Sequence, residues 1–213
     1  MSIENQPYRY EAIALSNEST VVAEFLPDAL GVRETGYQSE AALESAFIEQ
    51  LQRQAYEYLP ISSEAELVAN LRALLEQLNK TVFSDAEWQR FFTTCIAGSN
   101  DGILEKTARI QEDHIQVLKR DDGSSKNVYL IDKANIHNNV LQVINQYETS
   151  AGESGGKHAT RFDVTVLVNG LPMVHVELKR RGVDIREAFN QINRYQRDSF
   201  WAGSGLFEYV QLF

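Results

Sequence analysis

The segment Arg161–Lys179 constrains the fold most, because its pattern predicts two neighbouring strands joined by a short turn. Polar and apolar residues alternate along both halves, and Asn169-Gly170 is typical of a hairpin turn. The apolar positions that would share one face are Val164, Val166 and Val168 on the first strand and Val174, Val176 and Leu178 on the second. The hairpin therefore predicts a sheet that covers a hydrophobic core.

The other face of this hairpin carries Asp163 on the first strand and His175, Glu177 and Lys179 on the second. Their convergence depends on the register. A two-residue turn would set Asp163 opposite Val176 and leave Glu177 on the far face. A three-residue loop would set Asp163 directly across from Glu177. We predict the three-residue loop or an equivalent bulge, because only these arrangements bring the two acids together.

Two acids and a lysine on one face suit metal-assisted phosphoryl chemistry. Asp163 and Glu177 would repel each other unless a divalent cation lay between them, and oxygen ligands favour Mg²⁺. Such an ion polarises a phosphate and lowers the pKa of bound water. Lys179 could orient that water or stabilise the transition state, and the carbonyl of Leu178 could add a ligand. The alternative interpretation of the three charges is a surface salt bridge.

Three further residues are candidates for the same site. Gln191 and Tyr195 are four residues apart on a predicted helix that follows the cap Asp184, so they share a face and could contact phosphate oxygens. The alternative is a tyrosine packed beside Ile192 next to a solvated glutamine. Glu44, on an early predicted helix, is a possible third carboxylate or else a solvated helix acid.

The remaining pattern predicts an α/β fold with a mixed sheet flanked by helices. Capping residues at Ser39, Ser63 and Ser84 begin predicted helices, the first running to about Tyr58. The helices that begin at Ser63 and Ser84 suggest a helical insertion at about residues 60–110. We expect residues 1–213 to form a single domain. Further strands are predicted near residues 8–15, 21–25, 114–118, 128–131, 140–144 and 207–213. A turn is predicted at Asp121-Asp122-Gly123. Because the chain stops within the last strand, we expect it to be part of a longer protein.

Charge and cysteine content narrow the setting. A net charge of −10 argues against a freestanding nucleic-acid binder, but residues 157–197 carry a local charge of +4. Affinity for DNA would then come largely from partners or other domains. The single cysteine, Cys95, fits core packing in a reducing compartment. Without a signal peptide or a long apolar run, we expect a cytoplasmic protein with no membrane partner.

These residues resemble the PD-(D/E)-x-K nuclease core with the Gln-x-x-x-Tyr extension of RecB-like nucleases and of the R subunits of type I restriction–modification enzymes. The resemblance to R-subunit N-terminal domains extends over nearly the whole chain, including Asp101–Thr107, Val128–Asp132 and the run Glu177–Gln191. One departure is Phe162, which replaces the superfamily's proline before the aspartate.

The resemblance implies a Mg²⁺- or Mn²⁺-dependent endonuclease domain acting on double-stranded DNA. Asp163 and Glu177 would be the metal ligands, Lys179 the catalytic lysine and Glu44 the helix acid, with Gln191 and Tyr195 in the extension motif. ATP would act only through helicase-like motor domains beyond residue 213, since these residues contain no phosphate loop. Methyltransferase and specificity subunits would be the partners. A standalone repair nuclease or a non-catalytic docking module of the same fold are the alternatives.

Overall fold

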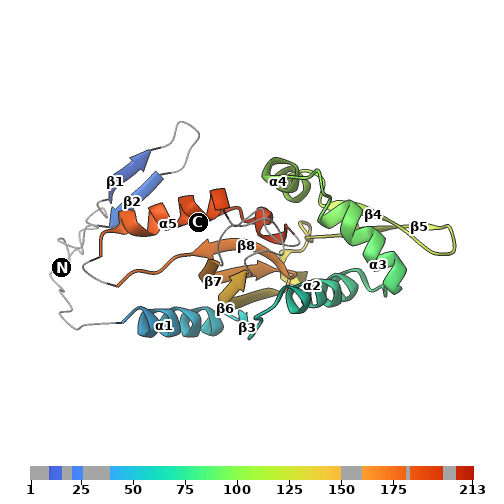
Figure 1. The fold of residues 1–213 in the computed structure, drawn as a ribbon. Helices are drawn as coiled ribbons and strands as arrows, with labels where there is room; N and C mark the ends of the chain where they lie inside the picture. The colour runs from blue at the N-terminus through green and yellow to red at the C-terminus, as the bar shows by residue number, and fades with distance from the viewer. Residues whose placement is uncertain (1–9, 16–20, 26–38, 150–159, 181–182, 199–204) are drawn as a thin grey trace, which may run out of the picture.

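A four-stranded mixed sheet lies at the centre of the computed structural model, which describes residues 10–15, 21–25, 39–149, 160–180, 183–198 and 205–213. The strand order is β3 (Glu57–Tyr58), β6 (Leu141–Thr149), β7 (Thr160–Val168) and β8 (Leu171–Val176). β3 is parallel to β6, and the other two pairs are antiparallel. In the view of Figure 1, helix α5 (Ile185–Asp198) runs above the sheet and helix α1 (Glu40–Arg53) below it. The predicted fold class is confirmed.

Hydrophobic side chains cover both faces of the sheet. Successive side chains of β7 point to opposite faces and therefore join two different clusters. Val166 packs in a cluster with Ile48 of α1. Its neighbour Leu167 belongs to the larger cluster, which includes Leu71 of α2 (Glu64–Asn79). Of the other predicted apolar positions, Val164, Val174, Val176 and Leu178 join the α1 cluster, as expected, whereas Val168 does not. β7 is thus covered on both sides, which fixes its register strongly.

Helix α1 begins where the sequence predicts and ends earlier. The hydroxyl of Ser39 accepts a hydrogen bond from the backbone N–H of Ala42 at 3.2 Å and so caps the helix. The predicted end near Tyr58 is wrong. Ala55 adopts a left-handed conformation with a φ of 68°, which interrupts the helix, and residues 57–58 form β3 beside β6 instead.

Helices occupy most of the stretch between residues 64 and 111. Both predicted capping boxes are present, Ser63 with Glu66 in α2 and Ser84 with Glu87 in α3 (Asp85–Phe91). α3 runs into a π-helical turn, Phe92–Ile96, and α4 (Ile103–Gln111) follows. The leucines of α2 pack in the larger core cluster together with residues of the sheet. None of the helices in the described ranges is long and apolar enough to cross a membrane.

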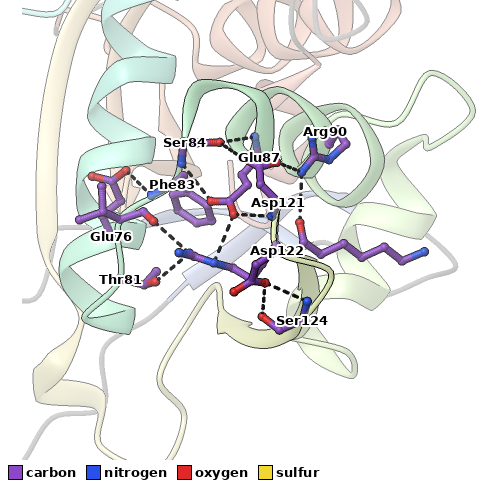
Figure 2. Close-up of polar contacts among 12 residues, drawn as sticks. Glu76, Thr81, Phe83, Ser84, Glu87, Arg90, Asp121, Asp122 and Ser124 are labelled. Carbon is purple, nitrogen blue, oxygen red and sulfur yellow. Dashed lines mark hydrogen bonds and ion pairs between the residues drawn. The ribbon is translucent and has the colours of Figure 1, made fainter.

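A polar network ties the β4–β5 hairpin to the connection between α2 and α3 (Figure 2). β4 (Ile115–Lys119) and β5 (Ser125–Tyr129) flank the predicted turn at residues 121–123. The buried carboxylate of Glu87 accepts hydrogen bonds from the backbone N–H groups of Ser84 (3.0 Å) and Asp121 (2.9 Å). The Arg120 guanidinium lies 3.2 Å from it. Because these contacts satisfy the buried charge, we assign Glu87 a structural role.

The other predicted strands are present with shifted ends. The strands expected near 140–144, 114–118 and 128–131 correspond to β6, β4 and β5. Those near 8–15 and 21–25 are the antiparallel pair β1 (Tyr10–Leu15) and β2 (Val21–Phe25), with residues 8–9 outside the described ranges.

The predicted strand at 207–213 is wrong over most of its length. Leu206–Tyr209 form a 3₁₀ turn, η4, and Leu212 alone in this segment bridges to β8, at Val174. Glu208 forms a buried ion pair with Lys106 of α4. These long-range contacts hold a strand-like sequence in a turn.

Candidate active site

The turn between β7 and β8 contains two residues, so the predicted three-residue loop is wrong. Val168 pairs with Leu171 across the turn. Asn169 and Gly170 have φ values of 51° and 84°, as in a type I′ turn. Helix α2 packs closely against this turn, since a Cβ on Gly170 would lie 2.6 Å from the Cα of Leu71.

A bulge in β8 supplies the register that the two acids require. Met173 has no pairing partner on β7, so the register shifts by one residue there. Beyond the bulge, Val164 pairs with Val176. One step further along both strands are Asp163 and Glu177. The bulge predicted as the alternative to a longer loop is therefore confirmed.

Asp163, Glu177 and Lys179 form one cluster at the end of β8. The backbone N–H of Leu178 donates to Oδ2 of Asp163 at 3.0 Å. Nζ of Lys179 lies 2.6 Å from Oε1 of Glu177 and 3.2 Å from the Leu178 carbonyl oxygen. The Glu177 side chain is fully buried, and that of Lys179 is 17% exposed. The ammonium is thus fixed beside the more buried of the two acids.

The two carboxyl groups have opposite pKa shifts. Burial raises the pKa of Asp163, and the neighbouring Glu177 raises it further, against the lowering effect of the Leu178 N–H. Burial also acts to raise the pKa of Glu177, but His175 and Lys179 outweigh it and leave that pKa below its ordinary value. Burial acts to lower the pKa of Lys179, yet its contact with Glu177 leaves it raised. Ionising Asp163 is therefore the costly step, and a nearby cation would favour it.

The acid pair has the chemistry of a divalent-cation site. Oε2 of Glu177 is buried and accepts no hydrogen bond from the described residues, with Nε2 of His175 at 3.6 Å. A buried carboxylate oxygen that accepts no hydrogen bond is costly, and an ion between the acids would satisfy it. Asp163 offers a second carboxylate, and the Leu178 carbonyl a further oxygen. These residues fit a cation with hard oxygen ligands.

Glu44 reaches the sheet from α1, where two amide side chains of β6 hold its carboxylate. Nδ2 of Asn145 donates to Oε1 and Nε2 of Gln146 donates to Oε2, each at 2.5 Å. The pairs on either side in the β6–β7 ladder place Gln146 opposite Asp163. Within the described ranges, no group of three or more His, Cys, Asp or Glu side chains is arranged to hold a metal ion. Glu44 is thus near the acid pair but engaged by amides.

The candidates on α5 are placed only in part. Oδ1 of Asp184 accepts a hydrogen bond from the backbone N–H of Arg186 at 2.9 Å, so this residue caps the helix as predicted. Gln191 lies within α5 and is partly buried. Tyr195 follows one turn later, and its side chain is outside the described part of the structure. The roles of both residues remain predictions.

Sequence reasoning gave no role to three residues that contact the candidate acids. The sequence predicts His175 on the polar face of the hairpin, but it does not predict the contact between His175 and Glu177. Asn145 and Gln146 are consecutive amides that interrupt an apolar strand, and this interruption was the available signal.

The sequence of this chain is similar to those of known proteins from one family. Residues 37–213 match the family described as the type I restriction enzyme R protein N terminus. The type I restriction enzyme EcoprrI endonuclease subunit of Escherichia coli is 46% identical over 202 residues, which cover 94% of this chain and 62% of that protein. The SsaAORF53P endonuclease subunit of Staphylococcus saprophyticus is 41% identical over 182 residues, which cover 83% of this chain and 18% of that protein.

The chain therefore spans less than two thirds of the length of either relative. The family match nevertheless covers most of the chain itself. The chain belongs to the family of type I restriction enzyme R protein N-terminal regions.

Proposed function

We propose that this chain is the Mg²⁺-dependent endonuclease domain of a type I restriction–modification R subunit and hydrolyses phosphodiester bonds of double-stranded DNA. The observation that carries the proposal is the bulge at Met173, which sets Asp163 beside Glu177 with Lys179 at 2.6 Å from the latter. Both relatives described above are named as endonuclease subunits, which supports the same activity here.

Each residue of the cluster has a distinct part in the proposed reaction. Asp163 and Glu177 hold the divalent cation, Mg²⁺ or Mn²⁺. When bound, that cation polarises the scissile phosphate and lowers the pKa of a water molecule. Lys179 is kept protonated by Glu177 and so offers an ammonium to orient the attacking water or stabilise charge on the phosphate. Gln191 and Tyr195 would contact neighbouring phosphate oxygens.

The rest of the proposed enzyme lies outside these residues. ATP-driven translocation would belong to motor domains that follow in the longer protein. Specificity and methyltransferase subunits would select the site, which accounts for a domain with a net charge of −10 that acts on DNA. We place the complex in the cytoplasm. The single cysteine of this chain is in keeping with a reducing compartment.

The test is the substitution Lys179→Ala in the full-length subunit, assembled with its partners. We expect DNA cleavage to be lost while ATP hydrolysis and translocation continue, because the lysine acts only on the reacting phosphate. Lys119→Ala, an exposed lysine on β4, is the matched control and should cleave normally. Retained cleavage by Lys179→Ala would remove this residue from the mechanism. Loss of translocation together with cleavage would favour the docking-module alternative.

A further inference from the structure

Gln146 has an unusual backbone conformation in the middle of β6. Its φ is 52°, in the left-handed region, although the strand continues from Leu141 to Thr149. A residue with a side chain rarely adopts this region outside turns and helix ends, and strained positions of this kind cluster at active sites and ligand-binding segments. The distortion falls directly opposite Asp163 on the neighbouring strand.

The distortion explains how two consecutive side chains reach one carboxylate. In a regular strand, successive side chains point to opposite faces. Here Asn145 and Gln146 both donate to Glu44, one to each carboxylate oxygen. The left-handed residue turns the second amide to the same side as the first. The strained backbone is therefore linked directly to the binding of Glu44.

The orientation of the Asn145 amide is fixed from the edge of the sheet. The hydroxyl of Tyr58, on β3, donates to Oδ1 of Asn145 at 2.9 Å. This leaves the amide NH₂ group to face Glu44, since the two ends of an amide are a donor and an acceptor. Tyr58, Asn145 and Glu44 thus form a chain of hydrogen bonds with one direction, and Gln146 donates to the other oxygen of the same carboxylate.

The same side of α1 also borders the segment that carries the acid pair. Oε1 of Glu40, one turn before Glu44, lies 3.4 Å from the backbone nitrogen of Arg180. Glu40 also contributes to the raised pKa of Lys179. One turn apart on α1, Glu40 thus contacts the end of the Glu177–Arg180 segment, and Glu44 contacts the strand position opposite Asp163.

We propose that Asn145 and Gln146 are positioning residues that hold the Glu44 carboxylate at the edge of the Asp163–Glu177 pair, where it strengthens the binding of a divalent cation. This inference rests on the proposed nuclease function. It adds that two amide side chains hold the third acid, Glu44, in place. Two charge-assisted hydrogen bonds restrict the rotation of this partly buried side chain. Supporting partners of this kind typically change metal affinity by about 10–100-fold.

The test measures Mn²⁺ binding to the full 213-residue chain by the paramagnetic resonance signal of free Mn²⁺. Gln146→Gly removes the amide and tolerates the left-handed backbone without steric cost. We expect the Mn²⁺ dissociation constant to rise about tenfold while the thermal midpoint changes little, because the relieved strain offsets the lost hydrogen bond. Asn145→Ala provides a second variant that leaves the backbone of Gln146 unchanged, and it should weaken binding similarly.

A double-substitution cycle separates positioning from a general structural effect. Glu44→Ala should weaken Mn²⁺ binding, and adding Gln146→Gly to it should cause no further loss, because the amide acts through Glu44. Asn127→Ala, an exposed amide on β5, should bind like the unaltered chain. Unchanged affinity in both amide variants would overturn the proposal, as would a full additional loss in the Glu44→Ala background.

Failure of this proposal can be told from failure of the proposed function. Asp163→Ala should abolish Mn²⁺ binding whatever the amides do. If it does, but the amide variants bind normally, the cation site stands and the positioning role is wrong. If Asp163→Ala binds as the unaltered chain does, the cation site itself is wrong.

Discussion

Gly170→Ala should destabilise the chain more than Gly123→Ala, although the two glycines have nearly the same positive φ. Their φ values are 84° and 85°. They differ in surroundings: a Cβ on Gly170 would lie 2.6 Å from the backbone of α2 at Leu71, whereas nothing lies within 4 Å of one on Gly123. The comparison therefore isolates the cost of the close packing between α2 and the β7–β8 turn.

The expected magnitudes follow from these two contributions. Placing alanine in the left-handed region costs about 1–2 kcal/mol, and Gly123→Ala should lose only this. Gly170→Ala adds a clash with backbone that cannot rotate away, and overpacking of this kind costs about 1–3 kcal/mol more. The total for Gly170→Ala is then about 2–5 kcal/mol. For a chain of this size each 1 kcal/mol corresponds to about 2–4 °C in Tm.

Urea unfolding of both variants, followed by far-ultraviolet circular dichroism, gives the two free energies of unfolding. A larger loss in Gly170→Ala, with an unchanged m-value, would agree with packing of α2 against this turn. Equal losses in the two variants would refute the close approach of α2 to this turn.

Further variants test other contacts. Glu208→Gln leaves the buried Lys106 ammonium without its charged partner and should lower the free energy of unfolding by about 3–5 kcal/mol, measured by urea unfolding. Ser63→Ala removes the N-cap of α2 and should cost about 1 kcal/mol by the same assay. Asp163→Asn should raise Tm at pH 7 in the absence of metal, because burial makes the charged aspartate costly and raises its pKa. That penalty develops as the pH rises from the unfolded-state pKa of about 3.9 through the higher folded value, so scans at lower pH should show the difference shrink; a difference independent of pH would contradict this origin.

The sheet hairpin shows how much a sequence can predict about such a site. The valine alternation correctly assigned the α1-facing side of β7 and β8, because burial imposes a period of two on each strand. The turn length was wrong, since Asn169-Gly170 alone satisfies a type I′ turn. The bulge at Met173 was foreseen only as an alternative. Pro172 was the local signal for it, because a proline lacks the N–H that a regular ladder needs.

The wrong prediction for the last strand has its origin in contacts between residues distant in sequence. The segment after Gly205 has a strand-like composition, but Lys106, about a hundred residues earlier, binds Glu208 and draws the segment into a turn. Likewise, the engagement of Glu44 by Asn145 and Gln146 joins residues separated by about a hundred positions. No local pattern encodes such pairings, so the candidate acids could be named from sequence but their supports could not.

A crystal structure of the chain grown with Mn²⁺, with the ion located by its anomalous scattering, tests the central claim most directly. We expect an anomalous peak for Mn²⁺ within ligand distance of a carboxylate oxygen of both Asp163 and Glu177, with the Lys179 ammonium beside Glu177. Side chains that point away from each other, or a peak at any other place alone, would contradict it.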